Sequence, residues 1–315
     1  MNYEKSTVKN NDKVKWPVRS PFGYYGAKLR IAKLIVENLP PHNAWVEAFC
    51  GSAAITLAKK PAPIEVINDL DDQIVNLFEQ LRSNSDKLCN AVKLTPYARF
   101  EFEKALKRES DIDPLEKARR FLVATMMTVN ATIADKSGFS YSQSYARTGK
   151  EARVNRWYNL PDRLEEIVER LRCIRIENLD AIKLLSMFEN RPATLVYLDP
   201  PYFIKRDHSY TIDAKDKDFH IELLDICQRA KCMILLSGYD NDLYDNCLTE
   251  KNGWTKKEIK TYTKITTGKQ FTKTEVLWKN SKLEKALRTG RVPIRLSKKE
   301  KSNGKINPIR NYPGL

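Results

Sequence analysis

The chain has 315 residues, 42% of them hydrophobic and 30% charged, which suits one large or two modest globular domains and excludes wholesale disorder. No apolar run reaches the roughly 18–20 residues of a membrane span, and residues 1–16 lack the apolar core of a signal peptide, so we expect a cytoplasmic protein. Lys and Arg exceed Asp and Glu by 15, which favours a polyanionic partner, although charge that serves only solubility is the alternative.

The first part of the chain predicts alternating helices and strands. After a polar segment at 1–16 that we expect to be flexible, apolar residues follow helical spacing over 28–39 and stop at two prolines. The next predicted elements are a buried strand at 44–49, a helix at 53–60, a strand at 64–67 and a helix at 71–82. Such alternation implies right-handed crossovers and a parallel sheet.

The pattern changes between 83 and 169, where the chain is mainly helical and charged. Helices are predicted at 97–109, 114–129 and 160–171. The stretch 135–157 lacks helical periodicity and is rich in Ser, Tyr and Arg. Its glycines, Gly138 and Gly149, indicate a hairpin or loop.

Alternation returns near residue 170. The predicted order is a strand at 173–178, a helix at 180–188, a strand at 194–198, a helix at 218–230 and a strand at 232–238. Two further alternating segments, 254–263 and 273–280, predict a terminal antiparallel hairpin. The sequence therefore predicts one α/β domain, formed by 17–82 and 170–280, with a helical insertion at 83–169.

The last segment, 281–315, is basic and punctuated by Gly and Pro. It carries a net charge of +8 and shows no patterned apolar face, so we expect a mobile tail. The six cysteines of the chain form no Cys-x-x-Cys pair and are interpreted as reduced thiols. With only three histidines besides, no zinc site is expected.

A turn of small residues follows the first strand. Gly51 lets the backbone approach a ligand, and ligands of open α/β sheets bind outside the carboxyl ends of strands. Asp69, at the end of the next strand, is placed to bond ribose hydroxyls. Because a full G-x-G-x-x-G pattern is absent, an adenosine-containing ligand without a pyrophosphate is favoured. A structural turn followed by a helix-capping Asp is the alternative.

A tetrapeptide with chemical meaning follows the apolar strand 194–198: Asp199, Pro200, Pro201 and Tyr202. Two prolines fix φ at about −65° and remove two backbone donors, so the direction of the Pro200 carbonyl is fixed. A carboxylate and a carbonyl can accept both hydrogens of an exocyclic amino group, while the Tyr202 ring stacks on the planar base. A plain Pro-Pro turn is the alternative, which the position after a buried strand disfavours.

With these motifs the chain resembles the Dam-type DNA adenine methyltransferases, the bacterial and phage class that uses S-adenosylmethionine. The resemblance covers most of 20–280. Its motifs are a cofactor motif at 22–28, a glycine loop at 47–52, a ribose-binding acid at 68–69, an adenine-packing segment at 178–180 and the catalytic tetrapeptide at 199–202. Segments at 237–239, 243–244 and 275–280, with His220, resemble phage-like members. Small-for-small departures occur at Ala27, Ala48 and Ala53.

The resemblance implies a Rossmann-like methyltransferase sheet and methyl transfer to the 6-amino group of an adenine flipped out of double-stranded DNA. It implies no metal and no covalent intermediate. The catalytic residues would be Asp199, Pro200, Pro201 and Tyr202, with a second stacking ring from Phe203. The cofactor residues would be Tyr24, Gly26, Lys28, Phe49, Gly51, Ser52, Asp69, Leu179, Asp180 and Asp199.

The resemblance also assigns target recognition to the insertion at 83–169. Gln and Arg can make bidentate contacts to base edges, and Ser and Tyr can bond phosphates or bases. The candidate DNA-binding residues are Ser140, Tyr141, Gln143, Tyr145 and Arg147. For each of them a solvated loop without DNA contact is the alternative.

Other functions remain open at this stage. Ring-carbon methylation of cytosine needs a cysteine nucleophile, usually after a proline, and the chain has no Pro-Cys dipeptide. Amino-methylation of cytosine, methylation of RNA adenine and non-catalytic DNA binding are the remaining rivals. The sequence does not give the target site, the role of the tail, a partner nuclease of a restriction–modification pair, or the oligomeric state, for which a monomer is the simplest case.

Overall fold

The computed structural model describes residues 16–23, 28–107, 109, 111–129, 138–146, 149–203, 214–264 and 270–293, with side chains except at 214–216, 261–264 and 270–273. The predicted residues Tyr24, Gly26 and Arg147 lie outside this part, as do most of 1–16 and the end of the tail. Among the helices that it contains, none combines the length and apolarity needed to cross a membrane.

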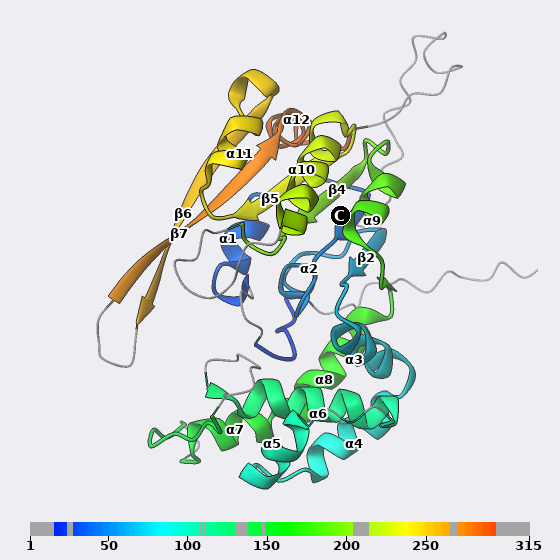
Figure 1. The fold of residues 1–315 in the computed structure, drawn as a ribbon. Coiled ribbons are helices and arrows are strands. Elements are labelled where there is room, and N and C mark those ends of the chain that lie inside the picture. The colour runs from blue at the N-terminus through cyan, green and yellow to red at the C-terminus, as the bar shows by residue number, and fades with distance from the viewer. Residues whose placement is uncertain are drawn as a thin grey trace, which may run out of the picture.

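A seven-stranded sheet in the order β3-β2-β1-β4-β5-β7-β6 organises the molecule (Figure 1). The strands are β1 Ala44–Glu47, β2 Ile64–Asn68, β3 Ile174–Glu177, β4 Thr194–Leu198, β5 Met233–Gly238, β6 Trp254–Lys264 and β7 Gln270–Asn280. The first five strands of that order are parallel, and β7 is antiparallel to both β5 and β6. The predicted parallel sheet with a terminal antiparallel hairpin is therefore confirmed.

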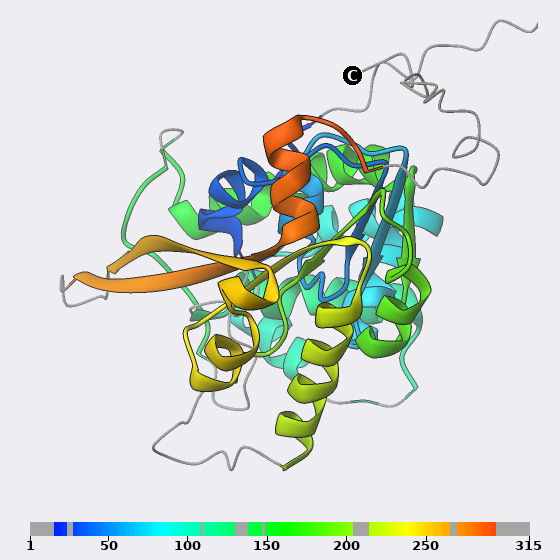
Figure 2. The same ribbon diagram turned by 90° about the horizontal axis from the view of Figure 1, so that it is seen from above.

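Helices cover both faces of this sheet (Figure 2). One face packs against η1 Lys28–Arg30, α1 Ala32–Val36, α2 Ala54–Ala58 and α12 Ser281–Thr289. The other face packs against α9 Ala181–Phe188, α10 Ala214–Arg229 and α11 Asp242–Cys247, after which η3 Glu250–Asn252 leads into β6. Because both faces are covered, β1, β4 and β5 are continuously buried, as the apolar runs predicted.

The remaining helices form the insertion below the sheet (Figure 1). They are α4 Ser85–Leu94, α5 Arg99–Leu106, α6 Pro114–Met127, α7 Ala152–Tyr158 and α8 Leu160–Leu171, reached through α3 Asp72–Ser83. One cluster of buried side chains runs from Leu57 and Ile67 through α3 into α6 and α8. The expected boundary after residue 82 therefore marks no break in the hydrophobic core.

A cluster of buried ion pairs links α8 to β2 of the sheet. Glu65 of β2 accepts from Lys59 at 2.7 Å and from Arg170, and Arg170 also donates to the carbonyl of Thr56 at 3.0 Å. All three charged side chains are almost fully buried. The insertion is thus tied to the α/β part by charge as well as by apolar packing.

Two expectations about local structure were wrong. Helix α7 begins inside the stretch 135–157, because Trp157 is buried and donates to the carbonyl of Thr95 at 2.8 Å, a tertiary contact without a periodic signal. The tail was expected to lack an apolar face, yet its first nine residues form α12, which buries Leu283 and Ala286. The expected turn at Gly149 is present, with φ +75° and a bridge between the flanking residues.

Candidate active site

The predicted motifs converge at one edge of the sheet. The glycine loop follows β1, Asp69 follows β2, and the tetrapeptide follows β4, and these three strands are adjacent and parallel. Parallel strands bring their carboxyl ends to the same edge, where open α/β sheets bind ligands. The spacing seen in the sequence thus becomes a spatial cluster.

A buried lysine lies at the centre of this edge. Lys28 is 6% exposed, and its Nζ lies 2.7 Å from Oδ1 of Asp199 and 3.3 Å from Oε1 of Glu275. The ammonium also donates to the hydroxyl of Tyr202, and it lies 4.8 Å from the centre of that ring. We call Lys28, Asp199, Tyr202 and Glu275 the Lys28 cluster. One cation faces two carboxylates there, so the ionised cluster carries a net charge of −1.

Burial sets the electrostatics of the Lys28 cluster. It raises the pKa of Asp199, with Lys28 opposing, and it raises the pKa of Glu275 in the same way. For Lys28, burial disfavours the charged form, but Asp199 and Glu275 outweigh it, so the pKa of Lys28 lies above its ordinary value. The lysine therefore stays charged, and its charge limits how far burial raises the pKa of the two carboxyl groups.

One oxygen of Asp199 is held and the other is not. Lys28 and the hydroxyl of Ser237, at 3.0 Å, both bond Oδ1. Ser237 is itself fixed by the hydroxyl of Tyr197 at 2.8 Å. No partner reaches Oδ2 within the described ranges, so this oxygen is a preorganised acceptor at the end of β4.

Tyr202 is packed more tightly than the stacking prediction assumed. Its hydroxyl lies 3.2 Å from Oε1 of Glu275, and its ring centre lies 4.3 Å from that of Tyr239. A Cβ on Gly238 would lie 3.4 Å from Trp278 and 4.0 Å from Tyr202, which are ordinary van der Waals distances, so the glycine packs closely against both rings. A small hollow with a cavity volume of about 10 Å³ remains beside Tyr202, lined by Pro200, Pro201, Tyr202, Phe203, Ser237, Gly238, Tyr239, Asn241 and Tyr244.

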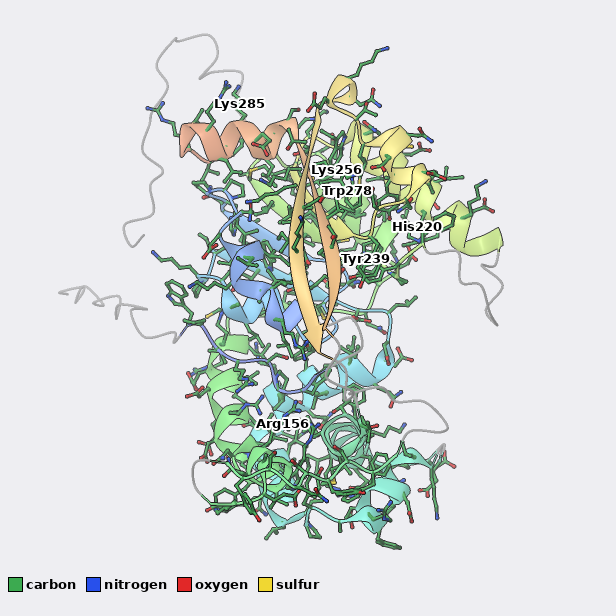
Figure 3. The ribbon with its side chains drawn as sticks, turned by 90° about the vertical axis from the view of Figure 1, so that its left-hand side faces the viewer. Arg156, His220, Tyr239, Lys256, Trp278 and Lys285 are labelled. Carbon is green, nitrogen blue, oxygen red and sulfur yellow. The ribbon has the colours of Figure 1, made fainter. Side chains whose placement is uncertain are left out.

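A group of aromatic side chains and His220 packs against the tetrapeptide and Tyr239 on the core side. His220 is buried and lies 2.8 Å from the hydroxyl of Tyr244, whose ring meets Trp278 edge-on at 5.3 Å. The rings of Phe203 and His220 are 5.3 Å apart. In Figure 3, Tyr239, His220 and Trp278 lie close together beside the β6–β7 hairpin. His220 therefore joins the tetrapeptide to α10 and α11.

The glycine loop is held by Asp69. Oδ2 of Asp69 accepts from the amide of Gly51 at 2.7 Å, and Oδ1 accepts from the amide of Asp71 at 3.0 Å. Gly51 has φ +48°, which favours glycine. Ala53, where the resembling family commonly has Gly, has φ +52°, a left-handed conformation that costs an alanine about 1–2 kcal/mol.

Two polar groups at this loop, Ser52 within it and Asp69 beside it, can bond a ligand. The hydroxyl of Ser52 is buried and has no hydrogen-bond partner in the described part of the chain. Burial raises the pKa of Asp69, and the amides of Asp71 and Gly51 oppose that rise. A buried hydroxyl without a partner is costly unless a ligand satisfies it.

The segment after β3 is fixed to the same edge. The side chain of Asn68 donates to the carbonyls of Ala48, at 2.9 Å, and Leu179, at 3.0 Å. Asp180 caps α9 by accepting from the amides of Ile182 and Lys183. Capping alone explains Asp180, whereas Leu179 and Phe49 are partly buried against the core behind the loop.

The predicted DNA-reading residues are not alike. Ser140 is 3% exposed, and its backbone bonds Met127 and Tyr97, which argues against a direct base contact by its side chain. Tyr141 is 70% exposed and Tyr145 81%, and Gln143 is exposed as well. Three of the five candidates are therefore accessible, one is buried, and one lies outside the described residues.

Sequence reasoning placed Ser237 and Glu275 in segments that resemble phage-like members of the family, but it assigned neither residue to the site. β7 pairs with β5 so that Val276 lies opposite Gly238, which brings Glu275 to the catalytic edge. The resemblance of 237–239 and 275–280 was the available signal. In the described ranges, no three His, Cys, Asp or Glu side chains gather in a way that could hold a metal ion.

Comparison with known proteins agrees with this geometry. Residues 24–273 match the family described as D12 class N6 adenine-specific DNA methyltransferase. Among solved structures, a putative methyltransferase from Escherichia coli is 11% identical, with 81% of this chain and 83% of that chain covered and a TM-score of 0.33. The S-adenosylmethionine-dependent methyltransferase from Agrobacterium tumefaciens is also 11% identical, with 80% and 60% covered and a TM-score of 0.35.

The structural likenesses are distant, whereas the family match spans most of the chain and includes Lys28, Asp199 and Tyr202 of the Lys28 cluster, while Glu275 lies just beyond its end. It confirms the resemblance seen in the motifs, and it speaks against the cytosine, RNA and non-catalytic alternatives. The chain therefore belongs to the D12 class of N6 adenine-specific DNA methyltransferases.

Proposed function

We propose that this chain is a site-specific enzyme of bacterial or phage origin that methylates the 6-amino group of an adenine flipped out of double-stranded DNA, with S-adenosylmethionine as the methyl donor. The observation that carries the proposal is the arrangement of Asp199. Its Oδ1 is fixed by Lys28 and Ser237, while Oδ2 has no partner among the described residues and remains as an acceptor next to Pro200, which lines the hollow.

The residues of the glycine loop fit a nucleoside-type cofactor. The buried hydroxyl of Ser52 needs a partner, Gly51 leaves room for close approach, and Asp69 has acceptor capacity left after its two backbone bonds. Phe49 and Leu179 are only partly buried against the core, so they can offer apolar surface to such a ligand. Bound there, S-adenosylmethionine supplies an activated methyl group on a positively charged sulfonium.

The Lys28 cluster supports such a cation electrostatically. Its net charge of −1 lies in a buried site, where charges interact more strongly than in water. The cluster therefore favours a ligand that carries a positive charge near Asp199. Lys28 takes part by holding Asp199 and Tyr202 in place.

Adenine must leave the duplex to reach this edge. Flipping costs a few kcal/mol and is offset by stacking and by hydrogen bonds to the flipped base. Oδ2 of Asp199 and the carbonyl of Pro200 would accept the two amino hydrogens. That hydrogen bonding draws the nitrogen lone pair out of conjugation with the ring and makes the nitrogen a better nucleophile.

The stacking role of Tyr202 requires a rearrangement. The hollow has a cavity volume of only about 10 Å³, far below the roughly 300–1,000 Å³ of ordinary ligand sites. The Tyr202 ring packs on Tyr239, so a base would enter by separating or sliding these rings. Glu275 and Lys28 hold the Tyr202 hydroxyl and so limit where the ring can go.

The test uses the full chain, isotope-labelled S-adenosylmethionine and mixed-sequence duplex DNA, followed by digestion to nucleosides. The expected product is N6-methyladenine, absent with Asp199→Ala. Methyl groups found only on cytosine, or only on an RNA substrate, would overturn the proposal. Calorimetry with S-adenosylhomocysteine tests the cofactor pocket independently of activity.

A further inference from the structure

Four arginines gather where the N-terminal segment meets the insertion. Arg19 lies in the N-terminal segment, Arg153 and Arg156 lie on α7, and Arg163 lies on α8. We call these four residues the arginine cluster. Burial lowers the pKa of Arg156, and the charges of Arg153 and Arg19 lower it further. Burial, Arg19 and Arg156 lower the pKa of Arg163 to about 10. The geometry agrees, because Arg163 bonds the carbonyl of Ser20, the residue after Arg19, and Arg153 and Arg156 are three residues apart on one face of α7.

Within the described ranges, no carboxylate forms an ion pair with any member of the arginine cluster. Two nearby groups favour the charged forms: Glu166 acts on Arg163, and Tyr97 acts on Arg156. Arg163 donates to the backbone carbonyls of Ser20 and, at 3.3 Å, Pro21, while its Nε is buried without a partner among the described residues.

Two other arginines of the insertion, Arg119 and Arg120, are each paired with two carboxylates. Arg119 bonds Glu101 at 2.8 Å and Glu116 at 2.6 Å, and Arg120 bonds Glu116 at 2.9 Å and Glu109 at 3.1 Å. Arg119 and Arg120 thus have carboxylates beside them. The arginine cluster has no ion-paired carboxylate in the described part of the chain, so it accumulates positive charge, which is unfavourable until an anion arrives.

The position of the arginine cluster relates it to the catalytic edge. Ser20, whose carbonyl Arg163 holds, donates its hydroxyl to the carbonyl of Ser52 in the glycine loop at 2.8 Å. In Figure 3, Arg156 lies on the part of the insertion that is nearest the sheet. The arginine cluster is therefore connected through Ser20 to the glycine loop at the catalytic edge.

We propose that the arginine cluster binds backbone phosphates of the DNA next to the flipped adenine. Guanidinium groups form bidentate hydrogen bonds to phosphate oxygens, and such contacts fix the register of a duplex without reading its sequence. Exposed Tyr141, Gln143 and Tyr145 on the neighbouring loop are then left to read bases. This proposal rests on the proposed DNA methyltransferase function.

The test replaces two members, Arg153→Gln with Arg156→Gln, and spares Arg163, which anchors the N-terminal segment. The matched control is Arg172→Gln with Arg175→Gln, two exposed arginines that pair with Glu169 and Glu177. Fluorescence anisotropy measures the affinity for cognate and scrambled duplexes over a salt series. Thermal unfolding confirms that both variants fold.

We expect the cluster variant to bind both duplexes at least about tenfold more weakly, the effect of losing a charge-assisted hydrogen bond. The slope of log affinity against log salt should become shallower by about 0.9 for each lost phosphate contact. The control should keep the wild-type slope. An unchanged slope in the cluster variant, or weakening on the cognate duplex alone, would overturn the phosphate assignment. Wild-type protein that methylates no adenine would instead overturn the proposed function.

Discussion

Lys28 and Asp199 lie 171 residues apart in the chain, yet their charged atoms lie 2.7 Å apart. The contact joins the N-terminal cofactor motif to the catalytic tetrapeptide. The lysine opposes the rise that burial causes in the pKa of Asp199, and the carboxylate helps to keep the lysine charged. The cofactor motif thus acts on the catalytic acid directly.

The first prediction concerns Asp199. Asp199→Ala should lower the methyl-transfer rate at least about a hundredfold, as does removal of one preorganised hydrogen-bonding group from an active site. Single-turnover assays at saturating DNA measure this. Asp240→Asn, at an exposed residue that pairs with Lys256, is the control and should keep the rate. A near-normal rate for Asp199→Ala would contradict the assigned role.

The second prediction separates cofactor binding from helix capping. Asp69→Ala should weaken S-adenosylmethionine binding by about 1.5–3 kcal/mol, the range for a hydrogen bond to a charged group, and it also frees the amide of Gly51. Asp71→Ala removes the cap of α3, so it should lower stability by about 1 kcal/mol and leave affinity unchanged. Calorimetry measures the affinity of each variant, and urea unfolding measures its stability. Equal affinities in the two variants would show that Asp69 does not line the cofactor pocket.

The parallel sheet and its ligand edge were predictable because their signals are local. Apolar strands, the turn at Gly51 and the two prolines after Asp199 each lie within a few residues of the feature that they specify. Glu275 was not predictable in this way, since its place depends on the antiparallel register of β7 against β5. The burial of Ser140 likewise comes from tertiary contacts of its backbone.

The third prediction concerns the buried ionic cluster between sheet and insertion. Glu65→Ala should leave Lys59 and Arg170 buried without their carboxylate, at a cost of about 3–5 kcal/mol. Urea unfolding at neutral pH measures the loss, with Glu169→Ala on the surface as control. Although burial opposes it, the two cations lower the pKa of Glu65, so its stabilisation is present above pH 4.5 and is lost as pH falls through the folded pKa.

The fourth prediction compares the exposed loop with the end of the tail. Because α12 packs on the sheet, the deletion must begin at residue 294 and not at 281. Removing 294–315, which carries six basic residues and one acid, should make the salt slope shallower and weaken binding to all duplexes alike. Gln143→Ala should cost about 1–3 kcal/mol on the cognate duplex only. A changed methylation site after the deletion would contradict this division.

The last prediction uses opposite changes within the Lys28 cluster. Methyl transfer requires ionised Asp199, and burial has already raised the pKa of that carboxyl, so the rate should fall as pH drops through this raised value. Lys28→Met removes the cation that opposes the rise, and the acidic limb of the pH–rate profile should move to higher pH. Glu275→Gln removes a competing carboxylate 3.3 Å from the lysine, and the limb should move to lower pH. Single-turnover rates at saturating DNA, measured from pH 5 to 9 with stability checked at each pH, give the three profiles. Shifts of both variants in the same direction would show that Lys28 does not act through the charge of Asp199.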